Sequence, residues 1–222
     1  MRKRARMTLL LCVAWALTAV AQNTVESIRK QYQEVYEWIG HMSDEFPAEG
    51  IPPEYFDLHV AQNLPGTGPH HENVRMYYGD KEPELVDGEE EGVNPYDDHY
   101  LLFVTAKYNF AAREFYEEYL YDEQGNVIFI YAITPDVEEP GNMSPYELRM
   151  WFDGDRLLRF MAKRFDGQPE GLDIATLKKG TFKEEHTGKT IPAKYEREAS
   201  RCQLCAKRFL TMFQGIDDNT YL

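Results

Sequence analysis

The chain has 222 residues, and its 38 Asp and Glu against 24 Lys and Arg give a formal net charge of −14 at pH 7. With 43% apolar and 14% aromatic residues it can build a core, which excludes wholesale disorder. Nucleic-acid affinity comes mainly from Lys and Arg that neutralise phosphates, so a chain this acidic is not expected to bind DNA or RNA.

The N-terminus has the three parts of a signal peptide over residues 1–21. A basic start, MRKRAR, precedes an apolar run from Met7 to Leu17, and small residues lead up to Ala21. We therefore expect cleavage after Ala21 and export of residues 22–222 to the periplasm or the cell exterior.

Two other interpretations of the N-terminus stay open. An uncleaved anchor would need at least ~17 apolar residues, which is more than the run provides. Lipid attachment at Cys12 would divide the apolar run and would place the bulky Leu11 before the cysteine. No later segment is long and apolar enough to span a bilayer, so no stable membrane insertion is expected after cleavage.

A helix is expected at the start of the mature chain. Asn23 and Thr24 can cap its N-terminus, and Gly40 ends it. Apolar side chains recur at spacings of three and four residues, which places them on one face that can be buried. They are Val25, Ile28, Tyr32, Val35 and Ile39.

Short runs rich in β-forming residues follow, and they predict an antiparallel sheet of about six or seven strands. The turn segments 122–126 and 153–155 place Gly beside Asp or Asn, as tight hairpins require. The run 127–134 is apolar at both parities, which indicates a central strand. The runs cover 56–60, 74–78, 99–110, 114–121, 127–134, 146–152 and 156–162.

The remainder of the chain holds a second helix. Glycines and prolines interrupt the pattern after residue 162, and 172–182 fits either a strand or a turn of helix. Pro192 then begins a helix that is expected to end near Gly215, with a frayed tail over 216–222.

These elements predict a single α+β domain over 22–215: an N-terminal helix, an antiparallel meander sheet and a C-terminal helix packed on the sheet. An acidic stretch at 79–98 interrupts the meander and is expected to form a solvated loop. It lacks the D-x-[DN]-x-[DN]-G spacing of a calcium-binding loop, so its charge density is the sole argument for calcium.

Four segments resemble those of uncharacterised exported bacterial proteins. They are IRKQY (28–32), NLPGTGP (63–69), AAREFYEEYLYD (111–122) and WFDGDRLLRF (151–160). The resemblance covers 23–162, and it implies export and an N-terminal helix followed by an antiparallel sheet. It implies no catalytic residue, and the C-terminal helix has no counterpart in it.

Cys202 and Cys205 are the cysteines that remain after signal removal, and their C-x-x-C spacing is compatible with redox exchange, half of a metal site or a small disulfide. Redox exchange needs the motif at a helix N-terminus, whereas this pair falls inside the predicted helix, on its apolar side. Zinc would need two further ligands that the sequence does not supply nearby. We expect buried, inert cysteines or a local disulfide.

Catalytic motifs are absent from the sequence. It contains no HExxH, no G-x-S-x-G and no phosphate-binding loop, so no cofactor and no metal site is predicted. His59, His70, His71 and Glu72 could converge on a metal, but adjacent loop histidines are expected to point apart.

Aromatic residues supply the remaining candidate site. Tyr119 and Tyr121 share strand parity, and Trp151 is expected two strands along, so the three could form a platform that stacks sugars or docks a protein. The alternative is that these rings form a core beneath the terminal helices.

The sequence therefore favours a non-catalytic exported binding or interaction module whose ligand or protein partner is not identified. The alternative is an exported hydrolase with carboxylates or histidines assembled in space, or a thiol redox protein that uses Cys202 and Cys205.

Overall fold

The computed structural model describes residues 23–40, 54–80, 99–111, 113–134, 144–167 and 174–220. The predicted signal peptide and most of the acidic stretch lie outside these ranges. No helix within them combines the length and the apolar character that crossing a bilayer requires.

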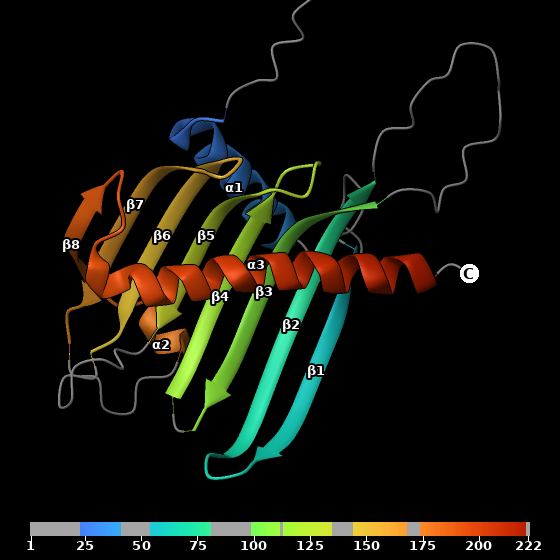
Figure 1. Ribbon diagram of the computed structural model, residues 1–222, viewed down its shortest axis with the longest axis horizontal. Helices are drawn as coiled ribbons and strands as arrows, with labels where there is room; N and C mark the ends of the chain where they lie inside the picture. Colours follow the sequence, from blue (N-terminus) through green and yellow to red (C-terminus); the bar gives the residue numbers. More distant parts are fainter. Residues whose placement is uncertain are drawn as a thin grey trace, which may run out of the picture.

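Eight strands form one sheet in which each strand pairs antiparallel with the next along the chain (Figure 1). The strands are β1 (Glu54–Leu64), β2 (Gly68–Asp80), β3 (His99–Phe110), β4 (Arg113–Tyr121), β5 (Val127–Thr134), β6 (Tyr146–Asp153), β7 (Arg156–Phe165) and β8 (Phe182–Gly188). The helices are α1 (Val25–Gly40), α2 (Ile174–Lys178) and α3 (Ala193–Thr220).

The predicted α+β meander with flanking helices is confirmed, and it has one strand more than expected. The additional strand, β8, has the sequence FKEEHTG, whose side chains are mostly exposed because it lies at the sheet edge. Such a polar segment carries little of the apolar alternation that identifies a strand. The segment 172–182, which fitted strand or helix, contains the short helix α2 and the start of β8.

The turn between β4 and β5 shows how the sequence sets a hairpin. The Asp122 carboxylate accepts hydrogen bonds from the backbone N–H groups of Gln124 (3.0 Å) and Asn126 (2.8 Å). Gly125 has a φ of 81°, in the left-handed region where a side chain is disfavoured. The expected tight turn at 122–126 is thus present, with glycine at the position that requires it.

Gly125→Ala is expected to lower the free energy of unfolding by about 1–2 kcal/mol, because the strained φ adds to a close contact. A Cβ at this position would lie 3.2 Å from a side-chain carbon of Leu210 on α3. Gly215→Ala is the opposite case, since Gly215 lies within α3 with open space around an added Cβ, and it should stabilise by roughly 0.5–1 kcal/mol. Urea denaturation of both variants tests this, and shifts of the same sign would contradict it.

Strand alternation gives the sheet two buried faces. Helix α3 lies across one face, as expected for the C-terminal helix, and α1 and α2 cover the other (Figure 1). The lower ends of β1 to β4 extend beyond α3 in this view.

The expected helix end near Gly215 is wrong, because α3 continues to Thr220 through most of the predicted frayed tail. Two contacts hold this last part in place. Ile216 packs against the core beneath α3, and Asp217 lies 2.9 Å from Nδ1 of His99 on β3. Tertiary contacts therefore extend the helix past a residue that alone would favour ending it.

Glu185 on β8 binds the start of α3 to the sheet. It accepts hydrogen bonds from Lys194 (3.1 Å), Arg164 (3.3 Å) and Tyr195. Burial by itself raises the pKa of Glu185, but the three donors outweigh it and lower the pKa from 4.5 to about 2.

Glu185→Gln is expected to make stability less dependent on pH in acid. Because the pKa is lower in the folded state, ionised Glu185 stabilises the fold above pH 4.5, and this contribution is lost as the pH falls from 4.5 to about 2. Unfolding free energies measured across this window should fall less steeply in the variant than in the wild type. Glu184→Gln on the same strand is the control, and an equal flattening in both variants would contradict the role of Glu185.

Candidate functional site

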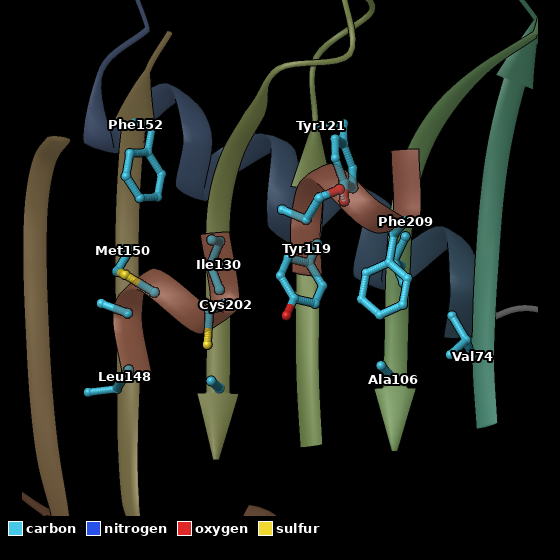
Figure 2. Packing of buried hydrophobic residues seen from close by; sticks show 14 of the residues in the cluster. Val74, Ala106, Tyr119, Tyr121, Ile130, Leu148, Met150, Phe152, Cys202 and Phe209 are labelled. Atoms are coloured by element: carbon cyan, nitrogen blue, oxygen red, sulfur yellow. Dashed lines mark hydrogen bonds between the residues drawn. The ribbon is translucent and has the colours of Figure 1, made fainter. Parts of the chain in front are cut away.

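The predicted aromatic platform is not formed. Tyr119 and Tyr121 are buried beneath α3 (Figure 2). Trp151 lies on the opposite face of the sheet, in the cluster under α1. The register explains the error: Tyr119 pairs with Ile130, which pairs with Met150, so Met150 shares the face of Tyr119 and its neighbour Trp151 does not.

The histidines do not converge. His70 and His71 are consecutive on β2 and therefore project to opposite faces, as expected of adjacent residues. His59 is exposed on β1 and lies 3.0 Å from Asp57, a carboxylate of its own strand. A metal site that uses His59, His70 and His71 together is thus not assembled.

A groove of about 650 Å³ lies between α3 and the ends of β2, β3 and β4. It exists because these strands extend beyond the helix that covers their upper parts (Figure 1). We call it the arginine groove, since four of its lining residues are arginines. It is lined by His70, Glu72, Tyr108, Phe110, Arg113, Phe115, Glu117, Arg197, Glu198, Arg201, Cys205, Arg208 and Phe209.

Aromatic rings form one wall of the arginine groove. Tyr108 and Phe115 are cross-strand partners whose rings stack, with centroids 4.9 Å apart and planes 4° apart. Phe110 is 50% exposed, which is unusual for a phenylalanine. Sequence reasoning missed these rings, although Phe115 has the same strand parity as Tyr119.

A buried carboxylate links the groove to α3. Glu117 is 0% exposed and accepts hydrogen bonds from the hydroxyls of Tyr108 (2.6 Å) and Tyr119 (2.5 Å). Burial and the Glu117 charge raise the pKa of both tyrosines, so their hydroxyls remain donors. Arg201 of α3 forms an ion pair with Glu117, donates to Glu198 (2.5 Å) and donates to the oxygen of Tyr108 (2.5 Å).

The next residue, Glu118, repeats this arrangement on the other face. It is 1% exposed, and it accepts hydrogen bonds from Tyr116 (2.6 Å), Tyr32 of α1 and Lys178 of α2 (3.3 Å). Two consecutive carboxylates on β4 thus hold helices on opposite faces of the sheet. The alternation of a strand places them there.

The cysteines lie deep within α3. Cys202 is the tenth residue of the helix and is buried, Cys205 is partly buried, and both are free thiols. Burial and the nearby Glu117 carboxylate raise the pKa of both thiols, which disfavours the reactive thiolate.

One cluster of these side chains has the composition of a metal site. Ligand atoms of Glu117, Glu198 and Cys202 lie within 4.8 Å of one another. The guanidinium of Arg201 already contacts all three, at 3.5 Å from the sulfur of Cys202. A protein cation therefore occupies the place that a metal ion would take.

Native thiols are expected to react slowly. At pH 7.5, iodoacetamide should modify Cys202 at least ~100-fold more slowly in the folded protein than in urea, because alkylation requires the exposed thiolate. Cys205, which lines the groove, should react at an intermediate rate. Mass spectrometry of timed samples measures both rates. Equally fast labelling in the folded and unfolded states would show activated, accessible thiols.

The fold and these contacts define the structural class of the protein. It is an eight-stranded antiparallel meander with helices on both faces of the sheet and an arginine-lined, aromatic groove beside α3. No family model, no curated protein and no solved structure matches the chain.

Proposed function

We propose that the protein is an exported, non-catalytic binding module whose arginine groove takes an anionic ligand with a ring or apolar portion. The observation that carries the proposal is Arg113, which lines the groove beside exposed Phe110. Its guanidinium makes no hydrogen bond or ion pair with any residue that the structure describes. A cation held next to rings in this way is suited to an aromatic or other amphipathic anion.

The charges of the groove support an anion. Two of its arginines are paired with its acids: Arg201 with Glu117 and Glu198, and Arg208 with Glu72 at 3.5 Å. Four arginines face three glutamates in all, so the groove has a local positive excess on an acidic protein. The volume of about 650 Å³ falls within the usual range of small-molecule sites.

The enzymatic alternatives have weaker support. Both carboxylate oxygens of Glu117 are engaged by donors, which does not suit a general acid or a nucleophile. The raised pKa values of Cys202 and Cys205 disfavour redox exchange. A screen that found turnover of an ester or a polymer, abolished by one point mutation, would replace the binding proposal with the hydrolase.

The aromatic sulfonate 1-anilinonaphthalene-8-sulfonate is a suitable probe, because it joins an anionic group to apolar rings. A fluorescence titration of the native protein should show saturable binding at one dominant site. Arg113→Gln and Phe110→Ser should each weaken binding of the probe about tenfold, as loss of a charged contact or of an apolar ring contact with the probe predicts.

Lys207→Gln and Leu204→Ser are the matched controls, since both residues are exposed on α3 and neither lines the groove. They should leave the affinity within about twofold. Equal affinity in the wild type and both groove variants would contradict the proposal.

Export is part of the proposal and depends on the signal-peptide pattern of residues 1–21. Protein recovered from outside the cytoplasm should begin at Gln22. A cytoplasmic protein that retains Met1 would remove this part of the proposal while leaving the groove unaffected.

A further inference from the structure

A second, smaller pocket lies on the opposite face of the sheet, between α1, α2 and strands β4 to β6. Its volume is about 230 Å³. An apolar cavity of about 150 Å³ is large enough for benzene, so this pocket has room for a ring with a small substituent. Five of its lining residues are aromatic: Tyr32, Tyr36, Phe129, Tyr131 and Trp151.

Cations of the protein already lie against these rings. The guanidinium carbon of Arg29 is 5.3 Å from the ring centroid of Trp151, and that of Arg149 is 5.4 Å from the centroid of Tyr131. The Lys178 amine is 6.0 Å from Tyr36. A pocket lined by five aromatic rings would ordinarily attract a cationic ligand, but here the protein supplies its own cations.

The positive charges are only partly neutralised. Among the described residues, Glu118 is the acid that lines the pocket, and it accepts hydrogen bonds from two tyrosine hydroxyls and Lys178. Arg149 lies 2.8 Å from Glu147, while Arg29 forms no ion pair with the described residues. The indole N–H of Trp151 is buried and has no hydrogen-bond partner among the described residues. The pocket thus has positive charge that its described acids do not fully neutralise.

We propose that this pocket, distinct from the arginine groove, binds a small ring-bearing carboxylate. The carboxylate lies between Arg29 and Arg149, which can donate in the paired geometry that carboxylates accept. The ring packs against Trp151 and Phe129.

Indole signals in a ¹H–¹⁵N spectrum test this directly, because the chain has three tryptophans, Trp15, Trp38 and Trp151, and Trp→Phe variants assign each signal. Titration of the native protein with benzoate should shift the Trp151 signal saturably and leave the Trp38 signal unchanged. Choline, a cation that prefers aromatic cages, should shift neither signal. Absence of a saturable benzoate shift at Trp151, or a shift caused by choline, would overturn the proposal.

Arg29→Gln supplies the matched test of charge, with Lys30→Gln as its control. Both residues are on α1, and each substitution removes one positive charge. Arg29 lines the pocket, whereas Lys30 pairs with Glu34 on the exposed side of the helix. Arg29→Gln should weaken benzoate about tenfold, and Lys30→Gln should change it less than about twofold. Equal benzoate affinities in the two variants would overturn the assignment of the carboxylate site to this pocket. Because Trp151 reports on this face of the sheet alone, the result of the benzoate titration is separate from that of the probe titration in the arginine groove.

Discussion

Arg201→Met is expected to lower the free energy of unfolding by about 3 kcal/mol, because it leaves the Glu117 carboxylate buried without its cation. Removing one partner of a buried pair costs more than the pair itself contributes, since the remaining charge stays away from water. The hydroxyls of Tyr108 and Tyr119 still donate to Glu117 and limit the loss. Urea denaturation at pH 7 measures the change.

Two further variants identify the cause. Lys207→Met removes a positive charge from an exposed position on the same helix, and it should change stability by no more than about 0.5 kcal/mol. The double variant Arg201→Met, Glu117→Gln removes both charges. Its loss of unfolding free energy should be smaller than the sum of the two single-variant losses by about 1 kcal/mol or more. Additive effects would show that Arg201 and Glu117 do not stabilise α3 as a pair.

Phe209→Ala is expected to cost about 3–4 kcal/mol, because it opens a cavity where α3 meets the sheet. Phe209 is buried, and its ring centroid lies 5.3 Å from that of Tyr119 in an edge-on contact (Figure 2). Calorimetry should show a lower melting temperature with a single cooperative transition retained.

Leu204→Ala provides the control for Phe209, since Leu204 lies on the same helix but is 68% exposed. Its effect should stay within about 0.5 kcal/mol. Similar losses in the two variants would contradict the packing of α3 on this face of the sheet.

The parts of the fold that the sequence predicts well depend on local patterns. The spacing of Ile28 and Val35 on α1 follows the helical period, and both are buried. Asp122 and Gly125 favour a tight turn through local contacts that do not depend on the rest of the chain. The antiparallel pairing of β4 with β5 and of β6 with β7 follows from such short connections.

The aromatic site could not be predicted in the same way, because the face that a residue occupies depends on strand register. Trp151 and Tyr119 each match the pattern of a half-buried strand. A bulge between Leu120 and Tyr121 shifts the pairing of β4 with β5, so parity cannot be carried from Tyr119 to Trp151 by counting residues.

The arginine groove depends on an arrangement that no local pattern encodes. Arg201 is far from Tyr108 and Arg113 in the sequence, and the three residues meet because α3 leaves the ends of β2 to β4 uncovered. The exposure of Phe110 marks the groove in the structure, but it depends on where α3 lies on the sheet and not on the residues around Phe110.

A crystal structure of the protein with 1-anilinonaphthalene-8-sulfonate tests the central proposal most directly. We expect the rings of the probe to lie against Phe110 and the Tyr108–Phe115 stack, with the sulfonate within hydrogen-bond distance of Arg113. Probe bound elsewhere, with the arginine groove empty, would contradict the proposed function.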